Sequence, residues 1–324
     1  MIITRTPFRV SFVGGGTDLA SYYRTGYGAV VSATIDKYMY ITVNKRFDDS
    51  IRVSYSVTEI ADSVDDIRHD IVREALKMTG ITKGIEITSI SDIPSGTGLG
   101  SSSSFAVGLL NALYIYKGQQ RSAHELAEKA CRLEIEVLGH PIGKQDQFAA
   151  AYGGVNYFRF NSDESVTYKP IDLTDADLEA MNIKLSMWYT GIIRSADEIL
   201  TRQNKGTADK LGILDYMRDQ ADALSADMCK NGFSESFAQA IHAGWLKKKS
   251  ITDSISNSRI DELYDLALAN GAKGGKILGA GGGGFLLFYC DADKHDVMAK
   301  ALGLRELHFR ITDHGSRVVF FSEN

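Results

Sequence analysis

The stretch Pro94-Ser95-Gly96-Thr97-Gly98-Leu99-Gly100-Ser101-Ser102-Ser103-Ser104 carries the strongest structural signal in this sequence. It follows an expected strand, residues 84–90, and precedes an apolar segment, residues 101–116, that we expect to form a helix. A Gly-rich loop between a strand and a helix directs free backbone N–H groups and the positive end of the helix at one point in space. The stretch therefore favours an anion site, with phosphate as the natural ligand.

The letters of this loop exclude two common phosphate-binding loops. No Gly-Lys-Ser/Thr follows, which rules out a Walker A loop, and the glycine spacing does not match Gly-x-Gly-x-x-Gly. A tight connection closed by a serine cap is the alternative interpretation. If the loop binds phosphate, a Cβ at Gly98 would intrude where the backbone approaches the ligand. The phosphate contacts are then assigned to Gly96, Thr97, Gly98, Leu99, Gly100, Ser101, Ser102 and Ser103.

Length and composition are typical of a folded chain with room for two cores. The 324 residues are 44% apolar and 24% charged, and at roughly 150 residues per domain the length favours two domains. Thirty-six Lys and Arg against 41 Asp and Glu give a net charge of −5. No overall basic field is therefore available to hold a nucleic acid or an anionic bilayer, and an anionic ligand needs a local site.

Cysteine content and hydropathy indicate the compartment. The three cysteines are widely spaced, and their odd number without a CxxC argues against a disulfide scaffold or a structural zinc. The N-terminal residues lack the apolar region of a signal peptide, and the least polar run, residues 105–116, is shorter than the ~20 residues that cross a membrane. We expect a cytoplasmic protein that binds neither membranes nor nucleic acid.

Strands and helices are expected to alternate irregularly. Ile, Val, Thr and aromatic content predicts strands at residues 2–13, 29–45, 52–55, 84–90, 183–189 and 276–290, a hairpin at 154–160 and 166–171, and a closing pair within 308–321. Helical periodicity predicts helices at residues 64–78, 101–116, 122–138, 259–270 and 294–302, with two or three more between 196 and 249. This order favours an α+β protein. The polar stretch 172–177 is the expected boundary, between domains at 1–176 and 177–324.

Two glutamates on the expected helix 122–138 face different environments. Glu136 lies beside Arg132, and an i,i+4 ion pair explains it. Glu134 lies on the apolar stripe, where a carboxylate must find a cation or hydrogen-bond donors, so it is the better candidate for a magnesium ligand. Asp146 lies where a loop enters a short helix, and this position alone favours a helix N-cap.

The Gly-rich loop and two further motifs resemble those of the GHMP kinase family, which includes galactokinase, homoserine kinase and mevalonate kinase. The family's phosphate loop reads Pro-x-Gly-x-Gly-Leu-Gly-Ser-Ser, as residues 94–102 do. Its first motif is similar to residues 7–18, Pro-Phe-Arg-Val-Ser-Phe-Val-Gly-Gly-Gly-Thr-Asp, and its third to residues 279–284, Gly-Ala-Gly-Gly-Gly-Gly. The resemblance spans the chain and implies a two-domain fold, with an N-terminal ribosomal-protein-S5-domain-2-like unit and a C-terminal ferredoxin-like unit.

The resemblance also implies a chemistry, the ATP-dependent phosphorylation of an alcohol with Mg²⁺. The segment around Asp146 is similar to the galactokinase-type Gly-x-Pro-x-Gly-x-x-Asp-Gln, which assigns proton acceptance to Asp146. Arg9, otherwise a surface strand residue, would hold this carboxylate and offset charge during transfer. Glu134 precedes Asp146 by twelve residues, the galactokinase offset of the metal ligand. Ser101 and Ser102 would complete the metal site.

The resemblance further implies a sugar as acceptor. Asp18 corresponds to the aspartate that binds sugar hydroxyls, while Gly15 and Gly16 replace larger side chains and leave room for a longer substrate. Within the family, several stretches are most similar to kinases of D-glycero-D-manno-heptose 7-phosphate. This implies transfer to the anomeric hydroxyl, giving a 1,7-bisphosphate for GDP-heptose and surface polysaccharide. Lys144 and Arg194 are candidates to hold the acceptor's phosphate, and a surface charge is the alternative for each.

Three further expectations complete the interpretation. The third motif is expected to contact substrate at Gly281, Gly282 and Gly283. A fucokinase-like or other sugar 1-kinase that takes an unphosphorylated sugar is the alternative function, and a catalytically silent sugar or nucleotide sensor is a third. The expected partners are ATP and a sugar phosphate, and the sequence leaves a homodimer open.

Overall fold

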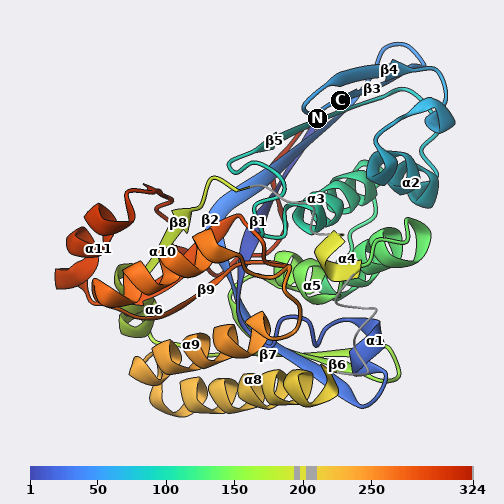
Figure 1. Ribbon diagram of the computed structural model, residues 1–324. Coiled ribbons are helices and arrows are strands. Elements are labelled where there is room, and N and C mark those ends of the chain that lie inside the picture. The colour runs from blue at the N-terminus through green and yellow to red at the C-terminus, as the bar shows by residue number, and fades with distance from the viewer. Residues whose placement is uncertain (193–197, 202–209, 323–324) are drawn as a thin grey trace.

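The structure, a computed structural model, describes residues 1–192, 198–201 and 210–322, which form two β-sheets with helices packed against them (Figure 1). The larger sheet has the order β13-β1-β2-β5-β3-β4, with β6 and β12 also paired to β2 and β7 paired to β6. Its strands are β1 (Ile2–Val13), β2 (Tyr27–Lys45), β3 (Ile51–Ser54), β4 (Thr58–Ala61), β5 (Ile85–Ser91), β6 (Val155–Asn161), β7 (Val166–Pro170), β12 (Ile311–Thr312) and β13 (Arg317–Phe321).

Helix α3 (Ser101–Tyr116) is the central helix of this half. It is buried almost all round, from Ser103 to Tyr114, because it packs on β1 and β2 and is itself covered by other helices. Those helices are α2 (Asp70–Thr79), α4 (Ala123–Cys131), the π-helical turn η2 (Arg132–Val137) and α5 (Gln145–Tyr152). The apolar stretch that predicted a helix at 101–116 thus forms it with the same bounds.

The smaller sheet has the order β11-β8-β10-β9. Its strands are β8 (Leu185–Tyr189), β9 (Ala272–Ile277), β10 (Phe285–Cys290) and β11 (Arg305–Glu306). The helices of this half are α6 (Asp175–Lys184), α8 (Leu211–Asn231), α9 (Glu235–Lys249), α10 (Ser258–Ala269) and α11 (His295–Leu302). A second apolar cluster, which includes Trp188, Trp245 and Tyr264, forms its core. The mixture of sheets and helices confirms the α+β expectation.

Two expected strands differ from the prediction. The Gly-rich segment 276–290 is a hairpin, β9 and β10, in which residues 278–284 form the connecting loop. The segment expected as a strand from 183 begins with the last turn of α6, and the strand starts only at Leu185. A capping box between Thr174 and Asp177 starts α6, so the polar stretch at the expected boundary also begins a helix that was not predicted.

Two expected helices differ as well. The helix predicted at 64–78 is split, with a 3₁₀ turn η1 (Val64–Asp66) before α2 begins at Asp70. The helix predicted at 122–138 is α-helical only to Cys131 and continues as the π-helical turn η2. Such single π turns occur often at functional sites, and this one carries Glu134.

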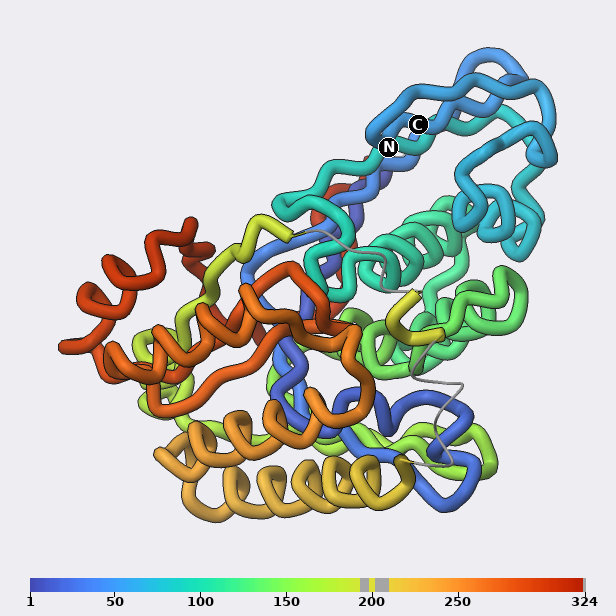
Figure 2. The backbone as a smooth tube through the Cα atoms, viewed as in Figure 1, coloured from blue at the N-terminus to red at the C-terminus, as the bar shows by residue number. Residues whose placement is uncertain are grey.

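The end of the chain returns to the first sheet. Strand β13 pairs antiparallel with β1 and β12 pairs with β2, so the red C-terminal segment lies beside the blue N-terminal strand (Figure 2). Residues 311–321 therefore belong to the sheet of the first half, although the expected second domain included them. The boundary at 176/177 otherwise stays a prediction. No helix in the described ranges is both long and apolar enough to span a bilayer, and the cytoplasmic location also stays a prediction.

Candidate active site

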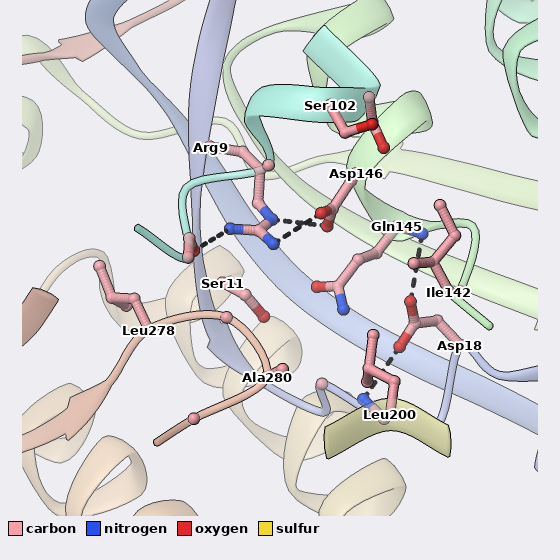
Figure 3. Close-up of a pocket in the computed structure, with 18 of the residues that line it drawn as sticks. Arg9, Ser11, Asp18, Ser102, Ile142, Gln145, Asp146, Leu200, Leu278 and Ala280 are labelled. Carbon is pink, nitrogen blue, oxygen red and sulfur yellow. Dashed lines mark hydrogen bonds and ion pairs between the residues drawn. The ribbon is translucent and has the colours of Figure 1, made fainter. Parts of the chain in front are cut away.

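A cavity of about 360 Å³ lies where the two halves of the molecule meet (Figure 3). Its N-terminal wall is formed by β1, the loop 94–100, the start of α3 and the segment 140–146 that enters α5. Its C-terminal wall is formed by the end of α9 and the loop 278–284. The first wall contributes the ionic and hydroxyl groups that the sequence analysis selected, and the second contributes mainly backbone.

Arg9 and Asp146 form a bidentate ion pair in the cavity (Figure 3). Arg9 Nε donates to Asp146 Oδ1 at 2.6 Å and Nη2 donates to Oδ2 at 2.7 Å, while Nη1 donates to the Gly98 carbonyl at 2.8 Å. The Arg9 side chain is only 5% exposed and that of Asp146 is 23% exposed. Arg9 is thus not a surface strand residue. The N-cap of α5 is Lys144, so Asp146 is not the cap.

The Gly-rich loop has the conformation that its glycines permit. Gly96, Gly98 and Gly100 have φ angles of 75°, 84° and 74°, in the left-handed region. Gly100 is the N-cap of α3, and no side chain caps this helix. The serine-cap alternative therefore does not apply, and the first N–H groups of α3 are left without a side-chain cap beside the cavity. Ser101, Ser102 and Ser103 all line it.

Gly98 packs against the other wall. A Cβ on Gly98 would lie 2.6 Å from the Leu278 carbonyl oxygen, and one on Gly279 would lie 2.5 Å from the Gly98 Cα. A Cβ on Gly284 would lie 2.3 Å from the Thr97 oxygen. The expectation that Gly98 is a glycine because phosphate approaches it is therefore incomplete, since the contact between the two Gly-rich loops already excludes a side chain.

Glu134 and Glu136 lie in different environments, as predicted. Glu134 is fully buried, and it accepts hydrogen bonds from Ser102 Oγ and from Gln147 Nε2, both at 2.7 Å. Burial raises the pKa of the Glu134 carboxyl, and the hydrogen bond from Ser102 opposes this shift. Glu136 is exposed, and its Oε2 lies 3.9 Å from Arg132 Nε. Glu134 itself does not line the cavity but holds Ser102, which does.

Oxygen groups for a magnesium ion are thus present in the hydroxyls of Ser101 and Ser102, which line the cavity, and in the carboxylate of Glu134, which lies behind Ser102 and binds its hydroxyl. In the part of the chain that the structure describes, no group of three or more His, Cys, Asp or Glu side chains converges on one point. This sparse set of hard oxygens suits Mg²⁺, which keeps several waters and takes further ligands from substrate phosphates.

Asp18 lies on the cavity, held by the backbone around it. Its Oδ1 accepts from the Gly16 N–H at 2.9 Å, and its Oδ2 accepts from the Gln145 N–H at 3.3 Å. Burial, with a contribution from Asp146, raises the pKa of the Asp18 carboxyl. Gly16 has a φ of 105°, which by itself favours glycine. Gly15 and Gly16 both line the cavity, and a Cβ on Gly15 would lie only 3.3 Å from Ser11 Oγ.

The structure describes one of the two expected phosphate cations, Lys144. Lys144 does not line the cavity, because its ammonium is bound to the Glu164 carboxylate at 2.7 Å and to the Glu164 carbonyl at 2.9 Å. Arg194 lies outside the residues that the structure describes. In the third motif Gly281 and Gly283 line the cavity, whereas Gly282 instead donates its N–H to the Ile255 carbonyl.

Sequence reasoning missed three polar groups of the cavity. Lys248 is only 5% exposed, and its Nζ donates to the Gly279 carbonyl at 2.5 Å. Burial, together with the charge of Arg9, lowers the pKa of its ammonium to about 8. Ser11 Oγ and Gln145 Oε1 are buried without a hydrogen-bond partner in the structure. Both residues line the cavity, so these orphaned oxygens are available to a ligand (Figure 3).

A signal for Lys248 did exist in the sequence. Three consecutive lysines, 247–249, end α9, where basic side chains complement the helix dipole. The helix dipole explains all three lysines equally well, so it does not single out the buried one, Lys248. Lys248 nevertheless continues the buried stripe of Phe237, Ile241 and Trp245 at helical spacing. A lysine on such a stripe needs a partner, for the same reason that singled out Glu134.

Comparisons with known proteins agree with this geometry. The GHMP kinases N-terminal domain matches residues 67–154, and the GHMP kinases C-terminal domain matches residues 222–305. The D-glycero-alpha-D-manno-heptose 7-phosphate kinase of Campylobacter jejuni is 31% identical over 93% of both chains. The L-fucokinase/L-fucose-1-P guanylyltransferase of Bacteroides fragilis is 25% identical over 87% of this chain and 34% of its own length. A solved D-glycero-D-manno-heptose 1-phosphate kinase from Bacteroides thetaiotaomicron superposes with a TM-score of 0.80, at 23% identity and full coverage of both chains.

Proposed function

The chain belongs to the GHMP kinase family and is an ATP-dependent sugar kinase, and from this premise we propose that it phosphorylates the anomeric hydroxyl of D-glycero-D-manno-heptose 7-phosphate. The product is the 1,7-bisphosphate, an intermediate suited to GDP-heptose and surface polysaccharide synthesis. The observation that carries this acceptor is the likeness to the Campylobacter jejuni heptose 7-phosphate kinase, which extends over nearly the whole of both chains.

In this proposal Asp146 accepts the proton of the sugar hydroxyl. Phosphoryl transfer requires that the acceptor oxygen be aligned, that charge be neutralised and that a proton be removed. The bidentate bond from Arg9 fixes the orientation of the Asp146 carboxylate and leaves further lone pairs for the hydroxyl. The buried Arg9 guanidinium also places positive charge where negative charge develops during transfer.

The loop 96–103 would bind the phosphates of ATP. The uncapped start of α3 offers N–H donors and the positive end of the helix dipole to these phosphates. Mg²⁺ would be held by Ser101, Ser102 and, through its bond to Ser102, Glu134, and when bound it neutralises phosphate charge. Asp18, with Ser11 and Gln145, would receive the sugar hydroxyls, because these polar oxygens line the cavity beside Asp146.

A panel of acceptors tests this function. Release of ADP by the purified protein is measured with heptose 7-phosphate, unphosphorylated heptose, fucose, galactose and mevalonate, each with Mg²⁺ and ATP. We expect heptose 7-phosphate to give the highest kcat/KM, and ³¹P NMR of the product to show a new phosphate on the anomeric carbon. A higher kcat/KM with fucose or another free sugar would favour the fucokinase-like alternative, which the 25% identical fucokinase supports. No ADP release with any of these acceptors would contradict the proposed acceptor class.

A further inference from the structure

Lys248 is a buried cation on the cavity wall that forms no ion pair with a carboxylate of the described residues. Among the described residues its ammonium donates to one acceptor, the Gly279 carbonyl, and no carboxylate hydrogen-bonds it. An ammonium carries three N–H donors, so two are left. A lysine that is 95% buried with unused donors is costly unless an anion or another acceptor completes its shell.

A second buried lysine shows what a structural role looks like in this protein. Lys276 donates to two carbonyls, those of Ser11 at 2.7 Å and Phe12 at 2.8 Å, and it does not line the cavity. It joins β9 to β1 and has no ligand to receive. Lys248 donates to one carbonyl where Lys276 donates to two, and it lies on the cavity, which indicates that its remaining hydrogen-bond partner comes from the substrate.

The other cations near the cavity are already engaged. Arg9 donates three hydrogen bonds, two to Asp146 and one to Gly98, and Lys144 is bound to Glu164 away from the cavity. The nucleotide phosphates have the start of α3 and the serine hydroxyls. Among the described lining residues, Lys248 is the one Lys or Arg left for a phosphate that the acceptor itself carries, and His140, which also lines the cavity, lies 3.8 Å from the Asp70 carboxylate.

We propose that Lys248 is a specificity-determining residue that binds the phosphate group already present on the sugar acceptor. This inference rests on the proposed function, because an unphosphorylated acceptor would offer Lys248 no phosphate. The carbonyl of Gly279, in the loop 278–284, holds the Lys248 ammonium in place. The C-terminal half of the molecule would therefore bind the acceptor's phosphate, while the N-terminal half carries out the transfer.

Three variants test the inference: Lys248→Met, Lys248→Arg and, as a matched control, Lys247→Met, which removes an exposed lysine from the same helix turn. The KM and kcat are measured with heptose 7-phosphate and with unphosphorylated heptose. We expect Lys248→Met to raise the KM for the phosphorylated sugar by ~10-fold or more, as for the loss of one charge-assisted contact. The KM for the unphosphorylated sugar should change little, Lys248→Arg should restore part of the selectivity, and the control should change neither.

Several outcomes would overturn it. No change in KM, an equal loss with both sugars, or a loss in kcat alone would mean that Lys248 does not read the acceptor phosphate. The proposed function is judged separately, by the wild-type preference between the two sugars before any variant is made. If the wild type prefers heptose 7-phosphate but Lys248→Met changes the KM equally for the two sugars, the proposed function stands and only the inference fails. A wild type that prefers the unphosphorylated sugar removes both.

The pH dependence of the wild type gives a second measurement that needs no variant to fold. The lowered pKa of Lys248, about 8, means that the ammonium is lost as the pH rises above that value. The charged groups that face it are Arg9, Asp18, Asp146 and Lys276. We expect the KM for heptose 7-phosphate to rise above about pH 8 while that for unphosphorylated heptose stays flat. This rise should disappear in Lys248→Arg, because arginine stays charged, and parallel curves for the two sugars would contradict the inference.

Discussion

The two walls of the cavity differ in how their polar groups are held. On the N-terminal wall the charges are paired within the wall, since Arg9 and Asp146 bind each other and Arg9 also binds Gly98. On the C-terminal wall glycine backbone packs directly against the Gly-rich loop opposite, and one ammonium, that of Lys248, has a single carbonyl partner. The ion pair of the first wall is therefore formed before a substrate binds, although Ser11 Oγ and Gln145 Oε1 on this wall still lack partners. The second wall depends on its contacts with the first wall and with a ligand.

This difference separates two kinds of effect. A group fixed by its own wall can be preorganised for the chemical step, and its loss should lower kcat. A group that depends on the opposite wall should change the affinity for substrates or the free energy of unfolding. The following substitutions test that division, in decreasing order of expected effect.

The largest effect is expected from Asp146→Asn on the N-terminal wall. An amide cannot accept the proton of the sugar hydroxyl, and proton acceptance typically contributes 10²- to 10⁴-fold, so kcat should fall by ~10² or more. The melting temperature and the affinity for ATP should change little, because asparagine has nearly the size of aspartate and the described hydrogen bonds of the Asp146 carboxylate go to Arg9 rather than to the Gly-rich loop. Steady-state kinetics and ATP titration measure both quantities. A kcat near that of the wild type would show that Asp146 only holds Arg9.

A smaller effect of a different kind is expected from Gly284→Ala, which changes the contact between the walls but no residue of the cavity lining. The added Cβ meets the Thr97 oxygen at 2.3 Å, and the φ of 88° disfavours any other residue. Strain of this kind costs roughly 1–3 kcal/mol, so the melting temperature and the affinity for ATP should both fall. Gly26→Ala is the control, because a Cβ there meets no atom within 4 Å. Unchanged stability would mean that the two loops do not support each other.

The smallest effect is expected from Glu134→Gln. An amide still hydrogen-bonds Ser102, and Gln147, whose Oε1 is buried without a partner, can turn to meet it. The fold should be kept, while the Mg²⁺ concentration for half-maximal activity rises several-fold, because a neutral amide replaces the carboxylate that holds Ser102. Glu136→Gln, on the exposed side of the same π-helical turn, should leave the Mg²⁺ requirement unchanged. Equal effects of the two substitutions would contradict a metal role for Glu134.

Local sequence patterns determined several features of this protein. The run of glycines before an apolar segment predicted both the loop 96–100 and the bounds of α3, because glycine and helix preferences act between neighbours in the chain. Helical spacing separated the buried Glu134 from the exposed Glu136 for the same reason. The capping box at Thr174 and Asp177 is also a local signal, and it starts α6, a helix that is absent from the helices predicted above.

The tertiary structure decided the features that depend on distant contacts. The loop 278–284 has five glycines against three in the phosphate loop, and two of the five, Gly279 and Gly284, are required by the backbone of Gly98 and Thr97, some 180 residues away. The pairing of β13 with β1 and the pairing of Arg9 with Asp146 also join segments that are far apart in the sequence. Whether a charged side chain such as Lys248 or Lys144 lies in a cavity or against a carboxylate depends on what packs beside it. Propensity and periodicity describe only near neighbours, so this choice is made when the two halves fold together.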